Sequence, residues 1–212
     1  MKDQAGRDIY DISRPLTAHT ACWPGDVPFS FRFSSKIRDG ASVNVGAVES
    51  SVHNGTHCDA PFHYDDAGLT VERLPVTTFV GPAYVVDVRD CLDDWSRPLR
   101  ELSIDQTPRI LFRTDAWLNS EQFPDRIPVM ARGLPDWLGQ QGVILVAVDL
   151  PSVDALDSKT LANHHALGRN GIAILEGLWL DQVPEGRYEL VALPLRITGA
   201  DGSPVRALLR SL

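Results

Sequence analysis

Residues 53–63 read HNGTHCDAPFH and hold three of the six histidines of the chain together with one aspartate. Side chains alternate between two faces of an extended chain, so His53, His57, Asp59 and His63 would point to the same side. A straight strand would keep His53 and His57 about 13 Å apart at Cα, close to the limit for sharing one ion. We therefore expect a bend at Gly55, because glycine adopts positive φ without steric cost.

A helix is the alternative geometry for this stretch, since histidines four residues apart on a helix chelate zinc in some metalloproteases. Gly55, Thr56, Asp59 and Pro61 are poor residues for a helix interior, which favours extended backbone instead. Imidazole and carboxylate ligands without thiolate suit zinc, with manganese or iron as competitors, and leave a position for water as catalytic sites do. Cys58 is at an even-numbered position, so its side chain would point to the other face of the extended chain. We expect it to pack in the core as a small apolar group.

A second set of ligand-type residues lies far along the chain. His164 and His165 belong to NHHALGRNG, and Glu176 follows the apolar run IAIL. A lone carboxylate at the end of a buried strand is costly unless it is paired or binds a metal. Spacing alone does not choose between His164 and His165, and a solvated position on a helix is the alternative for each.

The elements that must position these residues are mainly strands. Runs of β type indicate strands at 29–35, 43–52, 83–88, 109–114, 143–149, 172–175 and 188–197. The nearly uncharged runs at 83–88 and 143–149 are typical of central strands covered on both faces. ADGS at 200–203 separates two apolar runs and indicates an antiparallel pair of strands near the C-terminus.

Helical patterns lie between some of these strands. They are expected around 103–105, after Pro135, and from Ser158 to about Arg169, with Asp157 or Ser158 as N-cap and a C-cap at Asn170-Gly171. The sum predicts an α/β fold with a mixed β-sheet and a few helices.

The composition limits the class of protein. With 212 residues, 43% of them hydrophobic and 23% charged, we expect a single domain over 1–212. A net charge of -8 and the lack of a basic, aromatic surface pattern argue against nucleic acid as a partner. The run VILVAV at 143–148 is far shorter than the roughly 20 residues of a membrane span, and MKDQAGRDIYDIS contains no apolar h-region. Three cysteines without CxxC spacing suit a reducing compartment, so we expect a cytoplasmic protein.

The stretch HNGTHCDAPFH resembles the metal motif HxGTHxDxPxH of the cyclase-like metal-dependent hydrolases, and within them the chain is most similar to the bacterial kynurenine formamidases (arylformamidases). Supporting stretches are DISRPLTAHTACWPGD at 11–26, AVDLPSVDALDSKTLANHHAL at 147–167 and GIAILEGLWLDQV at 171–183. The resemblance extends in order over most of the chain. It implies a swivelling β/β/α fold and a homodimer or higher homo-oligomer.

The resemblance also implies two zinc ions, with manganese as a competitor. Carried over by position, His53 and His57 would bind the first ion, and Asp59 would bridge both ions. The second ion would be bound by Glu176 and by a histidine twelve residues before it, which selects His164.

Two further roles come from the same resemblance. His63 corresponds to the residue that donates and accepts the proton, and Trp23, in WPGD, corresponds to the aromatic residue that packs against the aryl ring of the substrate. The implied reaction is hydrolysis of N-formyl-L-kynurenine to L-kynurenine and formate in tryptophan breakdown. Water activated by the ions would attack the formyl carbon, and His63 would pass a proton to the leaving aniline nitrogen.

Other hydrolases remain as alternatives. A related amidohydrolase with the same metals could open a cyclic amide such as isatin or act on another arylformamide, although Trp23 and the stretch SVDALDSKT favour the kynurenine substrate. A serine hydrolase is not expected, because the nearest match to GxSxG, residues 40–44, lacks the second glycine. A zinc-binding protein without activity would have all metal positions filled by the protein. The acid/base residue His63 beside an open ligand set argues against that alternative.

Overall fold

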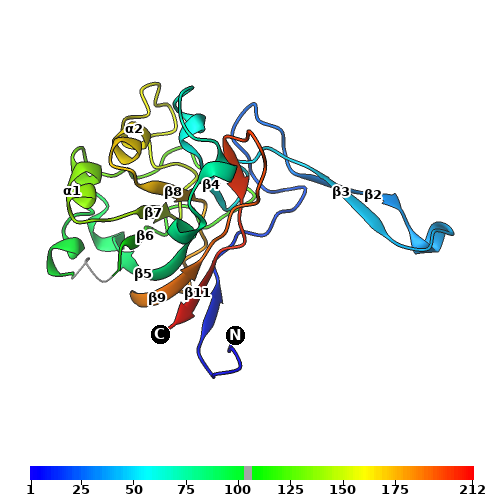
Figure 1. Ribbon diagram of the computed structural model, residues 1–212, viewed down its shortest axis with the longest axis horizontal. Coiled ribbons are helices and arrows are strands. Elements are labelled where there is room, and N and C mark those ends of the chain that lie inside the picture. The colour runs from blue at the N-terminus through cyan, green and yellow to red at the C-terminus, as the bar shows by residue number, and fades with distance from the viewer. Residues whose placement is uncertain (103–106) are drawn as a thin grey trace.

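The computed structural model describes residues 1–102 and 107–212, so the helix expected around 103–105 lies outside the described residues. In the described part the larger sheet has nine strands in the order β1-β11-β9-β5-β6-β7-β8-β4-β10 (Figure 1). Their bounds are β1 Ile9–Asp11, β4 His57–Asp59, β5 Val80–Asp87, β6 Arg109–Arg113, β7 Leu145–Val148, β8 Ala173–Glu176, β9 Gly186–Val191, β10 Gly202–Pro204 and β11 Leu208–Ser211. A second sheet pairs β2 Ser30–Ser35 with β3 Val45–Glu49.

Two α-helices, α1 Leu134–Gln140 and α2 Ala162–Arg169, accompany the sheet in this part of the chain. Short 3-10 turns connect the elements, namely η1 Ile37–Asp39, η2 Pro61–His63, η3 Val71–Arg73, η4 Val76–Phe79, η5 Arg89–Cys91 and η6 Pro98–Glu101. Neither α-helix, nor any other described helix, is long and apolar enough to cross a membrane.

The centre of the large sheet is parallel. Strands β5, β6, β7 and β8 run in the same direction, and antiparallel strands flank them on both sides. All four residues of β7 are buried, as are Val85 and Val86 of β5. The prediction that the uncharged runs at 83–88 and 143–149 form central strands covered on both faces is confirmed.

Alternating side chains of these strands enter two separate cores. Val86, Phe112 and Val146 pack on one face of the sheet with Leu138 of α1 and Leu167 of α2. The opposite face is enclosed by the sheet itself, which curls so that residues of β4, β9 and β11 join those of β5 to β8 in a second core. Both helices lie on one side of the sheet in Figure 1. The mixed sheet with a few helices is the fold class that the sequence predicts.

Strands β2 and β3 fall within the predicted strands at 29–35 and 43–52, but they pair only with each other and not with the main sheet. With η1 they form a hairpin that projects far from the body of the molecule (Figure 1). We call residues 30–49 the arm. Phe31 and Phe33 on the arm are 53% and 46% exposed, so the face of the strand that they share does not pack in the core of this chain.

Two local predictions are corrected by tertiary contacts. Helix α2 begins at Ala162 rather than at Ser158, and the carboxylate of Asp154 accepts the N–H groups of Asn163 and His164 at its start. A residue outside the helix thus supplies the cap that Asp157 or Ser158 was expected to provide. The C-cap at Asn170 agrees with the prediction.

The segment ADGS does not form a tight turn between two strands. β9 and β11 do pair antiparallel, as the sequence predicts, but residues between them leave to form β10 at the far edge of the sheet. β10 pairs with β4 so that Gly202 lies opposite Asp59, while on the other side of β4 His57 lies opposite Glu176 of β8. These two pairings bring three distant parts of the sequence to one end of the sheet.

Candidate functional site

The chain bends sharply before β4. Gly55 adopts φ +65, the conformation that the sequence predicts at this position. The bend is fastened by Thr56, whose Oγ1 donates to the carbonyl of Gly177 at 2.6 Å and accepts the N–H of Arg14 at 2.9 Å. Gly177 also has a positive φ of +67, and a Cβ on it would lie 2.0 Å from the carbonyl oxygen of Gly55. The bend and the end of β8 therefore touch through their backbones.

Two groups of metal-type donors meet at Asp59. The first group is His53, His57 and Asp59, and the second is Asp59, His164 and Glu176; within each group the donor atoms lie within 4.8 Å of one another. Asp59 Oδ1 lies 3.0 Å from Nδ1 of His53 and 3.4 Å from Nε2 of His57. All of these side chains except that of His53 are fully buried.

The second group surrounds the other oxygen of Asp59. His164 Nε2 lies 3.5 Å from Asp59 Oδ2 and 3.5 Å from Glu176 Oε1. His57 links the two groups, because its Nε2 is also 3.5 Å from Glu176 Oε2. Asp59 therefore occupies the position of a bridge between the groups.

Each of the three histidines in these groups has its second ring nitrogen fixed by a partner outside them. His57 Nδ1 lies 3.1 Å from the carbonyl oxygen of Gly55, and His164 Nδ1 lies 2.8 Å from Asp154. His53 Nε2 lies 2.9 Å from Asp201. An acceptor behind an imidazole holds its proton there and leaves the other nitrogen free as a ligand, which is how metal-binding histidines are usually oriented.

The residues present fit divalent metal ions. Asp59 Oδ2 is buried and has no hydrogen-bond partner in the structure. A buried carboxylate oxygen without a partner is costly, and a cation between the donors would remove that cost. Imidazole nitrogen and carboxylate oxygen, without thiolate, are ligands that zinc and its first-row neighbours accept.

In the absence of a cation the histidines themselves carry the compensating charge. Burial works against their protonation, but hydrogen bonds and charges of Asp59 and Glu176 outweigh it and raise the pKa of His57 to about 10. Burial also opposes the charge of His164, while Asp154, Asp59 and Glu176 raise its pKa to about 10. Burial alone would raise the pKa of Asp59, but the surrounding histidines hold it well below its usual range. Positive charge is thus strongly favoured at this position.

His63 lies beside the cluster rather than within it. It ends η2, which begins at Pro61, and 32% of its side chain is exposed. Its ring centroid is 4.0 Å from that of His53 and 5.9 Å from that of His164. Burial, followed by the positive charges of the neighbouring histidines, lowers the pKa of His63 below its ordinary value despite the opposing charge of Asp59. The neutral imidazole, which can accept a proton, is favoured near neutral pH.

A cavity of about 280 Å³ opens above these side chains. Four histidines and Glu176 form its polar end, and its walls are largely apolar, with Trp23, Trp117, Phe123, Pro151 and Leu161. Trp23 packs edge to face against Phe123 with ring centroids 5.3 Å apart. The cavity therefore offers an aromatic surface facing a charged end, as sites for small aromatic ligands do.

The structure brings together all seven residues that the sequence singled out. His53, His57, Asp59, His164 and Glu176 form the donor groups, and His63 and Trp23 line the same cavity. Between the two adjacent histidines, His164 points into the cluster, whereas His165 is exposed and touches the edge of Tyr64. Cys58 is fully buried in the core, and burial raises the pKa of its thiol to about 12.

Sequence reasoning missed Asp154 and Asp201, the two carboxylates behind the histidines. The general need of ligand histidines for an acceptor is the signal that could have pointed to nearby Asp154, ten residues before His164. No comparable signal exists for Asp201, which lies 148 residues from His53.

Similarity to known proteins agrees with this geometry. Residues 10–155 match the family model Cyclase, described as "Putative cyclase". The kynurenine formamidase of Bacillus cytotoxicus is 47% identical over 202 residues, which cover 95% of this chain and 97% of that protein. A solved structure described as a potential metal-dependent hydrolase with cyclase activity aligns with a TM-score of 0.83 and 26% identity, covering 97% of this chain and 98% of that one. Isatin hydrolase A of Ralstonia solanacearum, 24% identical, shares the fold with a TM-score of 0.78 over 99% of this chain and 94% of its own.

Proposed function

This chain belongs to the Cyclase family of hydrolases, and from that premise we propose that it hydrolyses N-formyl-L-kynurenine to L-kynurenine and formate. The chain is an amide hydrolase, as its relatives are, and the substrate is the finer part of the proposal. The main observation in support of this substrate is the cavity. Its walls are aromatic, and its polar end combines two metal-type donor groups with a separate histidine. An aryl formamide has the matching chemistry, an aromatic ring joined to one small hydrolysable amide.

The metal ions in this proposal are zinc, one for each donor group. His53, His57 and Asp59 would hold the first ion, and Asp59, His164 and Glu176 the second. When bound, such ions polarise the formyl oxygen and lower the pKa of a water molecule so that it attacks the formyl carbon near neutral pH. Manganese accepts the same nitrogen and oxygen donors and competes for the site.

The side chains around the donors supply orientation and proton transfer. Trp23 and Phe123 form a right-angled aromatic corner against which the aryl ring of the substrate can pack. His63 stands beside the polar end with a lowered pKa, so it can take a proton from the attacking water and pass it to the aniline nitrogen as the C–N bond breaks. Without that proton the leaving group would depart as a strongly basic anilide.

The proposed substrate also suggests a metabolic pathway and a cellular compartment for the reaction. N-formyl-L-kynurenine is formed in tryptophan breakdown by the kynurenine route, and we place this step in the cytoplasm. All three cysteines, Cys22, Cys58 and Cys91, are free, which suits a reducing compartment.

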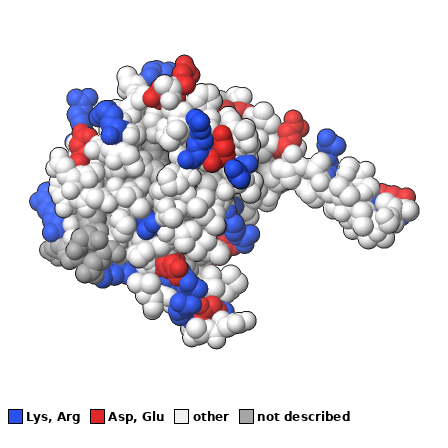
Figure 2. Space-filling view, viewed as in Figure 1, with Lys and Arg blue, Asp and Glu red and all other residues white. Residues whose placement is uncertain are grey.

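We further propose that the chain forms a homodimer or a higher homo-oligomer through the arm. Phe31, Phe33 and Val48 lie on one face of the β2–β3 hairpin, and Arg32 and Glu49 lie on the other. In Figure 2 the middle of this projection is largely white, with charged side chains near its base and its tip. An isolated two-stranded hairpin is at best marginally stable in water, so an apolar face of this kind calls for a covering surface.

A second copy of the chain is the occupant that the charges favour. The arm carries three basic residues, Arg32, Lys36 and Arg38, and two acidic ones, Asp39 and Glu49, whereas the whole chain has a net charge of -8. The excess of acid therefore lies on the body. An arm with a slight positive charge would meet a complementary surface on the acidic body of a partner copy.

A substrate panel tests the proposed activity. Zinc-loaded protein is incubated separately with N-formyl-L-kynurenine, isatin and simple formanilides, and kcat/KM is measured for each. We expect kcat/KM to be highest for N-formyl-L-kynurenine. Turnover of isatin alone would assign the chain to cyclic amides, and no turnover of any formamide with zinc or manganese would refute the proposal.

A further inference from the structure

Asp201 reaches the site on a fixed piece of backbone. It directly precedes β10, whose Gly202 lies opposite Asp59 in the pairing with β4. The carbonyl oxygen of Asp201 accepts the N–H of Ala60 at 2.8 Å, and the preceding residue, Ala200, accepts the N–H of Val71 at 2.9 Å. The position of this side chain is therefore set by the same strand pairing that sets Asp59.

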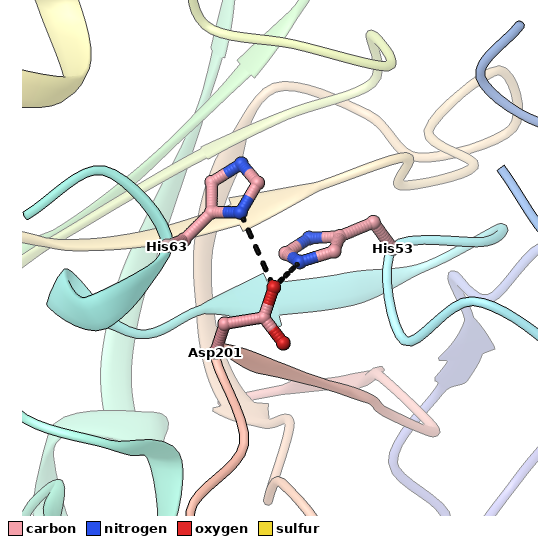
Figure 3. Close-up of side chains that lie close together, drawn as sticks. All are labelled: His53, His63 and Asp201. Atoms are coloured by element: carbon pink, nitrogen blue, oxygen red, sulfur yellow. Dashed lines mark hydrogen bonds and ion pairs between the residues drawn. The ribbon is translucent and has the colours of Figure 1, made fainter. Parts of the chain in front are cut away.

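One oxygen of Asp201 faces two histidines. Its Oδ2 lies 2.9 Å from Nε2 of His53 and 3.5 Å from Nδ1 of His63. Figure 3 shows one nitrogen of each ring directed at this oxygen, with the two rings next to each other on the same side of it. The two rings are themselves in contact, with centroids 4.0 Å apart and planes inclined by 36°. A single carboxylate thus touches one histidine of the first donor group and the histidine outside both groups.

The contacts fix which nitrogen of each ring remains available. A proton on Nε2 of His53, donated to Asp201, leaves Nδ1 directed at Asp59 and free to act as a ligand. A proton on Nδ1 of His63, directed at the same carboxylate, leaves Nε2 as the nitrogen that accepts and returns a proton. Both consequences suit the roles that the proposed function gives to His53 and His63.

We propose that Asp201 is a positioning residue that orients His53 as a metal ligand and His63 for proton transfer, through one shared carboxylate oxygen. The part that concerns His63 rests on the proposed function. A metal ion held by His53, His63 and Asp201 is the alternative, because donor atoms of these three also lie within 4.8 Å of one another. Such an ion would need Nε2 of His53 while Nδ1 serves the first group, and it would remove His63 from proton transfer.

The variant Asp201→Asn distinguishes the positioning role from the metal site. An amide keeps the size of the side chain but loses the charged oxygen that two N–H groups can share. Glu72→Gln is the matched control. Glu72 accepts the N–H of Gly199 at 3.1 Å and so supports the same loop, but its hydrogen-bond partners among the described residues, Gly199 and Thr70, do not include a histidine. Loosening of the loop alone would affect both variants alike.

Zinc affinity is measured first, by competition with a chelator and without substrate. We expect Asp201→Asn to bind zinc about 10- to 100-fold more weakly, the usual effect of removing a carboxylate behind a ligand histidine. Glu72→Gln should stay within about twofold of the wild type, because it is a separate site. Equal affinities of Asp201→Asn, Glu72→Gln and the wild type would overturn the proposal.

Turnover of N-formyl-L-kynurenine at saturating zinc then tests the link to His63. We expect kcat of Asp201→Asn to fall about 10- to 100-fold with little change in KM, and we expect the same substitution in a His63→Ala background to lower kcat by no more than about twofold. An equal loss of kcat in both backgrounds would overturn the role through His63. If Asp201→Asn instead abolished inhibition by excess zinc and kept the wild-type kcat, the metal-site alternative would replace the proposal.

Failure of the proposed function gives a different pattern. Wild-type protein would then turn over no formamide at all, while the chelator competition would still compare Asp201→Asn with Glu72→Gln. Weaker zinc binding by Asp201→Asn alone would uphold its role behind His53, and unchanged binding would overturn it.

Discussion

His63 differs from the other histidines of the site in its polar contacts. Among the described residues its ion-pair partner is Asp201, whereas His53, His57 and His164 all approach Asp59. It is also the most exposed of the four, with 32% of its side chain open to the cavity and solvent. These contacts suit a proton carrier better than a ligand.

His63→Ala should therefore keep the metal and lose rate. We predict a decrease in kcat of about 10²- to 10⁴-fold, the usual contribution of acid-base catalysis, with unchanged zinc content per chain. Turnover and elemental analysis of the same sample measure both quantities. Loss of zinc from this variant, together with full activity when zinc is supplied in excess, would show that the role is wrong.

The buried histidines predict an alkaline loss of stability in metal-free protein. In the folded state the pKa of His57 and that of His164 are both raised to about 10, from an ordinary value of 6.5. Between these values the folded protein binds more protons than the unfolded chain, so the stabilisation is complete below about pH 6.5 and is lost as the pH rises through about 10.

We predict that the free energy of unfolding of chelator-treated protein falls on the order of 1 kcal/mol per pH unit for each histidine across this range. Urea unfolding at several pH values measures it. Zinc-loaded protein is the control, and its stability should decline less, because a bound cation replaces the protons. A flat or rising profile in the metal-free protein would contradict the assignment of charge to these two histidines.

At the scale of elements, the site depends on how closely β8 approaches the bend before β4. Gly177 and Gly171 have nearly the same backbone conformation, with φ of +67 and +66. A Cβ at Gly171 would point into open space, whereas one at Gly177 would lie 2.0 Å from the carbonyl oxygen of Gly55. The pair separates the cost of a side chain at positive φ from the cost of pushing the two segments apart.

Gly171→Ala should destabilise the fold by about 1 kcal/mol, the cost of left-handed backbone for alanine. We predict that Gly177→Ala costs clearly more and also lowers the zinc bound per chain, because Glu176 and the Gly55 bend must both move. Urea denaturation and metal analysis of both variants test this prediction. Equal stability and equal zinc content in the two variants would show that the contact is not needed.

Elements with a strong local pattern could be predicted from the sequence. The run at 109–114 becomes β6 Arg109–Arg113, and the run at 172–175 becomes β8 Ala173–Glu176, because each contains consecutive apolar residues flanked by turn-type residues. The bend at Gly55 was also predictable, since no other residue of that stretch adopts positive φ so easily.

Features made by distant contacts could not be predicted in the same way. β10 has three residues, one of them proline, and is a strand only because it pairs with β4. The start of α2 moved from Ser158 to Ala162 because Asp154 both caps the helix and holds His164. The site residues that lie close together in the sequence could likewise be predicted from their motif. Asp201 could not, because only the order of strands in the sheet brings it to the site.

At the scale of the whole molecule, the arm is a hairpin whose two strands pair with each other and not with the main sheet. Its apolar face, with Phe31 53% and Val48 64% exposed, lies opposite a face that bears Arg32 and Glu49. Burial of a phenylalanine side chain stabilises by about 1.5–3 kcal/mol, and a symmetric dimer buries each interface residue twice. The arm could therefore dominate association.

Phe31→Asp should shift the protein toward the monomer, and we predict a dissociation constant raised by at least about 100-fold. Ser30→Ala changes the neighbouring residue on the opposite face without altering the charge of the arm, and serves as the control that should keep the wild-type assembly. Sedimentation equilibrium over a range of concentrations measures both. A monomeric wild type, or an assembly of Phe31→Asp as tight as that of the control, would contradict the proposed interface.

The proposed two-metal hydrolysis is tested most directly by adding zinc stepwise to chelator-stripped protein. Release of L-kynurenine from N-formyl-L-kynurenine is measured at each step. We predict no turnover in the stripped protein and a rise to a plateau when one ion has been added for each of the two donor groups that share Asp59. Undiminished turnover in the stripped protein, or none in the fully loaded protein, would contradict it.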